Sequence, residues 1–320
     1  MKSGVFLVLF SQQAFEQALD TAKAAGLQSV EIGTGGFPGT AHINAQEILN
    51  DDAAISRIRD AVDSRGLTIS ALSCHGNPLH PNAATAKSDH DDFVATVKLA
   101  EKLGVETVIT FSGCPGESVN STYPSWVTCP WPPEFLTVLE WQWNEIAIPY
   151  WKEQSAFLRK HNVRVAIEAH PGFLVYNTET ALRLREEAGD NIGVNFDPSH
   201  LFWQGMDPIE CVKALGKSIY HVHAKDTKID KRNTAINGVL DNKNYGDILN
   251  RSWVFRTVGY GHDDDFWKHF VSTLRLVGYD GTISIEHEDG LMSVNEGFTK
   301  AANFLNGLIL QESAGEMWWA

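Results

Sequence analysis

The sequence predicts an α/β protein in which a single (β/α)8 TIM barrel with long loops spans residues 1–320. Short apolar segments alternate with amphipathic helical stretches along the whole chain, which is the order expected of parallel strands joined by crossover helices. Eight such pairs in 320 residues fit one closed barrel. No linker rich in proline, glycine or serine divides the chain, so we expect one domain.

Each predicted strand is a short apolar run that ends near a polar residue or a glycine. The runs are 5–10, 29–33, 67–75, 105–111, 164–168, 192–197, 218–224 and 281–286. Helices are expected over 12–25, 51–64, 87–103, 134–161, 178–189, 207–216, from about 263, and over 293–310. An open doubly wound sheet is the competing layout. However, Gly33 and Gly35 are followed by Pro38, where a dinucleotide-binding GxGxxG loop needs its third glycine.

Polar residues with metal-binding side chains follow the predicted fifth to eighth strands. They are Glu168, Asp197, His223 and Glu286. In a barrel the carboxyl ends of all strands meet at one mouth, so these side chains should converge there. Three carboxylates held together would raise one another's pKa values unless a cation compensated them. The set therefore predicts one divalent metal ion, with Mn²⁺ favoured and Mg²⁺, Co²⁺ or Zn²⁺ as alternatives. For any one of these residues, a hydrogen bond to the backbone is the competing explanation.

Four motifs, IEAHP, NFDPSH, HVHAKD and ISIEHED, carry a resemblance over most of the chain. The sequence resembles the xylose-isomerase-like barrels, a sugar isomerase and epimerase superfamily that includes tagatose and psicose 3-epimerases, inosose dehydratases and, more distantly, endonuclease IV. The resemblance implies that Glu168, Asp197, His223 and Glu286 bind one Mn²⁺ or a related ion. It also implies that Glu168 and Glu286 move protons and that His200 hydrogen-bonds the substrate.

The chain departs from the family in two places. Endonuclease IV has a histidine after the fourth strand, where this chain has Phe111 and Ser112, and no Asp-x-His pair occurs over 225–262. The ketose 3-epimerases have a substrate-binding arginine where this chain has Ile229, and Lys225 and Lys228 are the candidate replacements. The resemblance therefore favours sugar chemistry without selecting a free ketose.

The predicted function is that of a metal-dependent sugar or keto-sugar isomerase or epimerase. Such an enzyme removes a proton beside a carbonyl and passes through a metal-stabilised enediolate. Because an enediolate can also expel a leaving group, the alternative is a lyase, either an inosose dehydratase or an enzyme that eliminates the aglycone of a 3-keto-glycoside. A second alternative is a non-catalytic sugar-binding subunit, although two proton-transfer carboxylates facing one cation argue against it.

Further residues are candidates for substrate contact. His75 ends the third strand, where it either contacts substrate or is a rim histidine, and Lys225 follows the seventh strand. Trp126 belongs to the insertion of about 112–133, whose aromatic side chains either cover the sugar or pack the loop. Glu31 could orient His75 or substrate. Three histidines next to the ligands are expected to support them rather than bind metal, namely His170, His221 and His287.

Composition limits the partners and the location. The formal charge of −14 and the pI near 5.3 argue against nucleic-acid binding. No stretch is long enough to span a membrane and no signal peptide is recognisable, so we expect a cytoplasmic protein acting on a small carbohydrate. We also expect a homo-oligomer, a dimer or a tetramer. The insertion of about 225–262 is a candidate lid or subunit contact, and the tail with Trp318 and Trp319 should pack on the barrel or on a neighbouring subunit.

Overall fold

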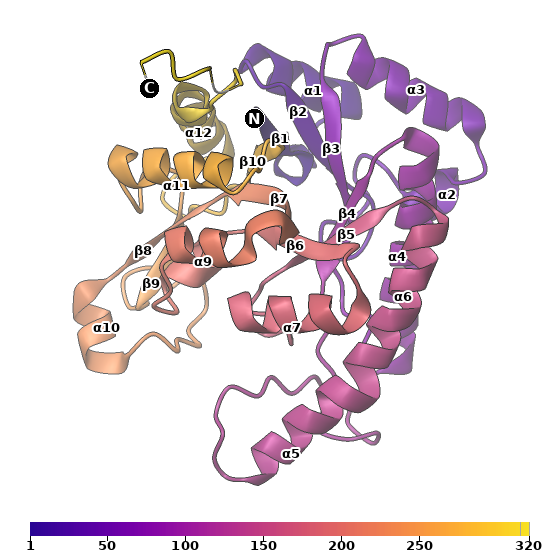
Figure 1. Ribbon diagram of the computed structural model, residues 1–320, viewed down its shortest axis with the longest axis vertical. Coiled ribbons are helices and arrows are strands. Elements are labelled where there is room, and N and C mark those ends of the chain that lie inside the picture. The colour runs from indigo at the N-terminus through magenta and orange to yellow at the C-terminus, as the bar shows by residue number, and fades with distance from the viewer. Residues whose placement is uncertain (314, 320) are drawn as a thin grey trace.

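Eight parallel strands close into a barrel in the computed structural model, which describes residues 1–313 and 315–319 (Figure 1). Around the barrel the order is β1-β10-β7-β6-β5-β4-β3-β2. The strands are β1 (Lys2–Phe6), β2 (Ser29–Gly33), β3 (Thr68–Ser73), β4 (Thr107–Phe111), β5 (Arg164–Glu168), β6 (Ile192–Phe196), β7 (Ile219–Ala224) and β10 (Thr282–Ile285). The predicted barrel and its eight strands are confirmed. The first strand is shorter than expected, because Leu7–Phe10 turns into a 3₁₀ helix.

Helices surround the barrel and connect its strands (Figure 1). They are α1 (Phe15–Ala24), α2 (Ala45–Ile48), α3 (Asp52–Asp63), α4 (Ala83–Leu103), α5 (Glu134–Trp141), α6 (Ile148–Lys160), α7 (Thr178–Ala188), α8 (Ser199–Phe202), α9 (Pro208–Leu215), α10 (Lys231–Asn237), α11 (Asp264–Leu276) and α12 (Val294–Leu308). The long helix expected over 134–161 is present, with the π-helical stretch Gln142–Ala147 between α5 and α6. None of the helices in the described part of the chain is long and apolar enough to cross a membrane.

Two strand pairs shift register where the interior of the barrel becomes polar. One shift falls between Val30 and Glu31 of β2, and the other between Val194 and Asn195 of β6. A bulge changes the direction in which the following side chain points. Here Glu31 and Asn195 both reach His223 inside the barrel. The irregular pairings therefore bring two polar side chains beneath the mouth.

The insertion after β7 is folded rather than irregular. Strands β8 (Asp226–Ile229) and β9 (Trp253–Arg256) pair antiparallel, and α10 lies between them in the chain (Figure 1). Asp226 anchors the hairpin, because its buried carboxylate accepts hydrogen bonds from the backbone amides of Gly259, Gly261 and His262 and from the Trp267 indole. Each of these bonds to a charged acceptor is stronger than a neutral one. These bonds connect the start of β8 to the segment that follows β9 and to α11.

The insertion over 112–133 has little regular structure and lies partly on the surface. Gln142 holds it, since its buried side-chain amide donates to the carbonyls of Pro115, Gly116 and Ser125. Tyr123 and Trp131 are 78% and 72% exposed, respectively. These two aromatic side chains are therefore mostly in contact with solvent.

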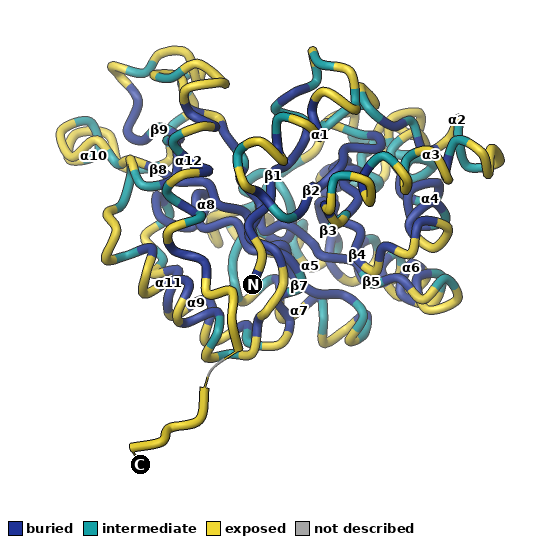
Figure 2. The backbone as a smooth tube through the Cα atoms, turned by 90° about the horizontal axis from the view of Figure 1, so that it is seen from above, coloured by how far each residue is buried: buried dark blue, intermediate teal, exposed yellow. Residues whose placement is uncertain are grey.

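The C-terminal tail extends away from the barrel (Figure 2). Trp318 and Trp319 are 88% and 69% exposed, so the prediction that they pack on the barrel is wrong. The two rings lie edge to face, with centroids 5.7 Å apart. Contact with a neighbouring subunit stays a prediction.

Candidate active site

Four side chains from neighbouring strand ends converge at the mouth of the barrel. Glu168 is the last residue of β5, Asp197 follows β6, His223 lies in β7, and Glu286 follows β10. Each offers a ligand atom, and these atoms all lie within 4.8 Å of one another. Parallel strands end at the same side of the barrel, which is why residues far apart in sequence meet here.

Glu168 lies among imidazole and amide groups of the barrel interior. His75 Nε2 lies 3.1 Å from its Oε2 atom, His223 Nδ1 lies 3.3 Å from the same oxygen, and Asn195 Nδ2 donates to it over 2.8 Å. Burial alone would raise the pKa of Glu168. The imidazoles of His75, His200 and His223 outweigh burial and hold that pKa well below its usual range. The carboxylate is therefore charged and fixed in orientation.

Asp197 and His200 form a second buried contact, one turn apart at the start of α8. His200 Nε2 lies 3.1 Å from Asp197 Oδ2, and Ser199 donates to Asp197 through its backbone amide and its hydroxyl. Burial opposes charge on both groups. Nevertheless, Asp197 raises the pKa of His200 to about 9, and His200 with Lys225 lowers the pKa of Asp197. The His200 ring also contacts the His170 ring, with centroids 4.1 Å apart and the planes tilted at 55°.

His223 links the mouth to the layer beneath it. Its Nδ1 atom lies 3.0 Å from Glu286 Oε2, and its Nε2 atom lies 2.9 Å from Glu31 Oε2. Glu31 also accepts a hydrogen bond of 2.5 Å from the Ser73 hydroxyl. Burial would raise the pKa of Glu31, but His223 and His221 outweigh it and lower that pKa to about 2. Glu31 thus contacts the predicted ligand His223, whereas the sequence suggested His75 or substrate.

The donor set fits a divalent cation. Glu286 Oε2 is buried and has no hydrogen-bond partner among residues 1–313 and 315–319, although it faces His223 Nδ1. Buried polar atoms are rarely left without a hydrogen bond, so this oxygen is available to a cation in addition to its contact with His223 Nδ1. Three carboxylates and one imidazole are a set that Mn²⁺, Mg²⁺ or Co²⁺ accepts. The four predicted residues are therefore the ones that would hold a metal.

Lys225 closes one side of the mouth. Its Nζ atom is 2.6 Å from Glu288 Oε2, 3.3 Å from Glu286 Oε1 and 3.8 Å from Asp197 Oδ2. The side chain is only 3% exposed. Burial would lower the pKa of Lys225, but Glu286 and the other carboxylates outweigh it and raise that pKa well above its usual range. Lys225 is therefore a buried cation beside the predicted ligands.

A cavity of about 180 Å³ opens onto this site. Its lining includes His75, Lys225, Glu168 and Glu286 together with the aromatic residue Phe111. Two of the predicted substrate-contacting residues, His75 and Lys225, therefore face the space in which a small ligand would lie.

The structure does not bring the other two predicted contacts to this cavity. His200 is not among the residues that line this cavity and contacts His170 and Asp197 instead. Trp126 packs edge to face on Tyr176, in a different cavity of about 200 Å³ next to Arg183. His170 lines the mouth although the sequence suggested a supporting role. Its place two residues after the Glu168 strand end is the feature that could have indicated it.

Comparisons with known proteins agree with this architecture. Residues 19–308 match the family described as xylose isomerase-like TIM barrel. The uncharacterized protein YfiH of Bacillus subtilis (strain 168) is 39% identical over 300 residues, covering 93% of this chain and 96% of YfiH. The structure of the IolI protein with a bound zinc atom matches with a TM-score of 0.66 at 17% identity, over 97% of this chain and 98% of IolI. Escherichia coli YcjR, a 3-keto-D-glucoside 4-epimerase, matches with a TM-score of 0.62 at 12% identity, over 96% of this chain and 98% of YcjR.

Proposed function

Since the chain belongs to the xylose isomerase-like TIM barrel family, we propose that it is a metal-dependent isomerase or epimerase of a keto-sugar. The observation that carries the proposal is the convergence of Glu168, Asp197, His223 and Glu286 within 4.8 Å. Two proteins with the same fold support the proposal. YcjR is a 3-keto-D-glucoside 4-epimerase, which supports this class of reaction, and the IolI structure contains a zinc atom, which supports a bound metal.

We propose that one divalent cation binds the four side chains, with Mn²⁺ as the first choice and Mg²⁺, Co²⁺ or Zn²⁺ as alternatives. Such an ion, when bound, lowers the energy of the negative charge that develops on substrate oxygens as a proton leaves carbon. The Glu286 oxygen that lacks a hydrogen bond supports a cation at this point. The carboxylate-rich set explains why zinc is not the first choice, because protein zinc sites usually contain more histidine or cysteine.

The two glutamates are the proposed proton carriers. Glu168 ends β5 and Glu286 follows β10, and two strands, β6 and β7, separate them around the barrel. They therefore reach a ligand in the mouth from different directions, as proton removal and return at different positions require. Asn195 and His75 fix Glu168 through its Oε2 atom. Return to the opposite face of the same carbon is epimerisation, and return to the neighbouring carbon is isomerisation.

The remaining polar groups of the mouth have proposed binding roles. His75 and Lys225 line the cavity and would donate hydrogen bonds to hydroxyl or carbonyl oxygens of the sugar. Lys225 also keeps Glu286 Oε1 in place over 3.3 Å. His200 holds Asp197 and Glu168 in their charged forms.

The test is deuterium uptake in D₂O. Protein loaded with Mn²⁺ is incubated with D-tagatose, D-fructose, an inosose and methyl 3-keto-β-D-glucoside, and mass spectrometry measures deuterium beside the carbonyl. Uptake with an intact carbon skeleton is the expected result. Uptake accompanied by release of part of the substrate would identify a lyase instead. If protein that demonstrably holds metal catalyses no uptake with any of them, the proposal of an enzyme is wrong.

Matched variants locate the activity. Glu168→Gln keeps the size of the side chain but cannot accept the proton, so uptake should fall by about 10²–10⁴-fold. Glu106→Gln is the control, because that carboxylate is 80% exposed and lies just before β4, at the opposite end of the barrel. Equal rates of deuterium uptake with the two variants as catalysts would contradict the assigned role of Glu168.

A further inference from the structure

A second cavity adjoins the mouth and is twice as large. It measures about 360 Å³, and the mouth cavity about 180 Å³. His170 and Glu288 line both cavities, so the two share a boundary. Small-molecule sites usually enclose about 300–1,000 Å³. The mouth alone is too small for that range, and the two together fall within it.

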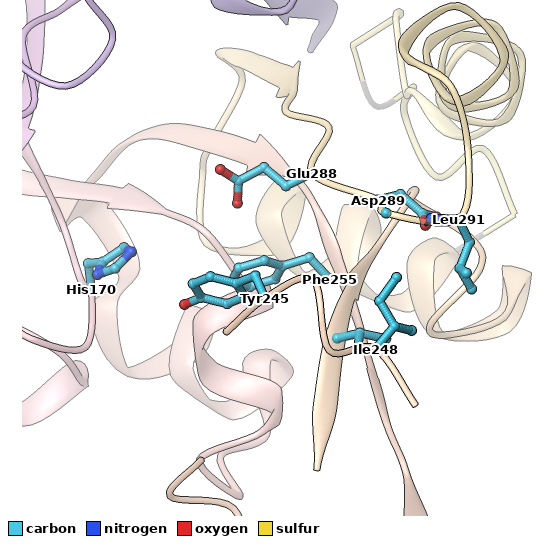
Figure 3. Close-up of a pocket in the computed structure, with 9 residues that line it drawn as sticks. His170, Tyr245, Ile248, Phe255, Glu288, Asp289 and Leu291 are labelled. Atoms are coloured by element: carbon cyan, nitrogen blue, oxygen red, sulfur yellow. Dashed lines mark hydrogen bonds between the residues drawn. The ribbon is translucent and has the colours of Figure 1, made fainter. Parts of the chain in front are cut away.

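The second cavity, hereafter the side cavity, is built by the insertion after β7. Its walls include Tyr245, Ile248, Val254 and Phe255 of the insertion, and Leu291 faces them from the loop after β10 (Figure 3). The rings of Tyr245 and Phe255 stack, with centroids 5.7 Å apart and planes at 21°. These aromatic and aliphatic side chains present an apolar surface to anything that enters from the mouth.

Two acidic side chains that line the side cavity, Asp289 and Glu288, already have partners. Asp289 accepts hydrogen bonds from the Arg256 guanidinium and from the backbone amides of Thr257 and Leu291. Glu288 contacts Lys225 over 2.6 Å. A second sugar in this space would bring several hydroxyl groups that need hydrogen bonds, and burying them without partners is costly. An apolar group has no such requirement, so the lining favours an apolar occupant.

Lys225 stands at the boundary between the cavities. Its Nζ atom lies 4.4 Å from the centroid of the Phe255 ring, on the wall of the side cavity, and 3.3 Å from Glu286 in the mouth. A ligand that extends from the metal-binding residues past Lys225 would therefore reach the stacked rings. A molecule with a sugar at one end and an apolar, ring-containing group at the other would place the sugar in the polar mouth and the apolar group in the side cavity.

We propose that the substrate is a keto-glycoside, with its sugar in the mouth and an apolar, ring-containing aglycone in the side cavity. This inference rests on the proposed function and names its substrate class. A free ketose would leave the apolar walls of the side cavity in contact with water. An aglycone that displaces this water gains the free energy of burying apolar surface.

The test compares two probes that differ in the aglycone, methyl 3-keto-β-D-glucoside and phenyl 3-keto-β-D-glucoside. Calorimetry measures binding to the metal-free and the Mn²⁺-loaded protein, and deuterium uptake gives kcat/KM for the loaded protein. We expect the phenyl compound to bind at least about tenfold more tightly in both forms. Equal affinities for the two compounds would overturn the inference.

Two adjacent residues provide a matched pair of variants. Ile248 lines the side cavity, whereas Leu249 does not line it and is 88% exposed. Ile248→Trp should fill the cavity and abolish the preference for the phenyl compound while the methyl compound binds as before, and Leu249→Trp should keep the preference. Leu291→Trp should fill the cavity from the opposite wall. It provides a second test of the inference if Ile248→Trp does not fold. If the cavity-filling variants and the control keep the same preference, the inference fails.

The two proposals can fail separately. In one outcome the loaded protein catalyses no deuterium uptake but binds the phenyl compound more tightly than the methyl compound, and Ile248→Trp abolishes this preference. The proposed function is then wrong and the aglycone site stands. Uptake that is equally efficient with both compounds, with equal binding, would support the enzyme and overturn the aglycone site.

Discussion

Two clusters of carboxylate and imidazole groups lie one above the other in the barrel and share His223. Both have ligand atoms close enough together to hold a metal. The lower cluster contains Glu31, His221 and His223, and all three are buried. The upper cluster contains Glu168, Asp197, His223 and Glu286, and it borders the mouth cavity. The two differ in how completely their polar atoms are paired.

In the lower cluster every side chain has a hydrogen-bond partner inside the protein. Glu31 accepts from Ser73 and contacts His223, and His221 contacts Asn195 and Ser70 through its two ring nitrogens. Burial lowers the pKa of His221 to about 4, so its imidazole is neutral at pH 7. In the upper cluster, Glu286 Oε2 lies 3.0 Å from His223 Nδ1 but makes no hydrogen bond among the described residues. This one buried oxygen without a hydrogen bond distinguishes the candidate metal site from the lower cluster.

The largest expected effect comes from removing a ligand of the upper cluster. A metal present at 100 times its Kd should stabilise the folded protein by about 2.7 kcal/mol. Glu286→Gln removes the carboxylate and its oxygen that lacks a hydrogen bond, so Mn²⁺ should no longer stabilise this variant, and deuterium uptake should fall with it. Urea unfolding with and without Mn²⁺ measures the effect. Metal-dependent stabilisation equal to that of the wild type would exclude Glu286 as a ligand.

A smaller effect is expected from the residue that joins the two clusters. Glu31 fixes His223 through Nε2, which leaves Nδ1 facing Glu286 and the proposed metal. Carboxylates that orient metal-binding histidines typically contribute about 10–100-fold in metal affinity. Glu31→Gln should therefore weaken Mn²⁺ binding within that range without abolishing it, as calorimetry would measure. Glu31→Asp, which keeps the charge, should recover part of the affinity, and identical losses in both variants would argue for a packing defect instead.

The sequence predicted the upper cluster better than its surroundings. Strand-end positions of Glu168, Asp197 and Glu286 follow directly from the alternation of strands and helices, so the barrel fold places them. The partner of Glu31 depends on a register shift within β2, which periodicity does not reveal. The position of Trp126 away from the mouth cavity was not predicted for a related reason, because the aromatic content of a long irregular loop does not indicate on which side the loop packs. Conversely, the fold of 225–262 depends on long-range pairing between β8 and β9, which short-range patterns do not specify.

A change within the lower cluster should affect folding rather than the metal. His221→Phe keeps an aromatic ring but leaves the buried Asn195 Oδ1 without the imidazole, whereas Ser70 keeps its hydrogen bond to the Val30 carbonyl. Leaving buried polar groups unpaired costs about 1–3 kcal/mol, so the free energy of unfolding of the metal-free protein should fall by that amount. Urea unfolding in the presence of a chelator measures this loss. A fall in Mn²⁺ affinity as large as that of Glu31→Gln would show that the two clusters act as one site.

The smallest expected effect comes from Ser70→Ala, at the outer edge of the lower cluster. The Ser70 hydroxyl donates to the Val30 carbonyl and lies 3.2 Å from His221 Nε2. An intramolecular hydrogen bond typically contributes about 0.5–1.5 kcal/mol, so Ser70→Ala should cost about 1 kcal/mol of unfolding free energy and leave Mn²⁺ affinity unchanged. His221 keeps Asn195 on its other nitrogen, which holds the ring in place. If Ser70→Ala lowered the Mn²⁺ affinity as strongly as Glu31→Gln does, the orientation of His223 would depend on the whole hydrogen-bonded chain from β3 to β7. The lower cluster would then belong to the active site.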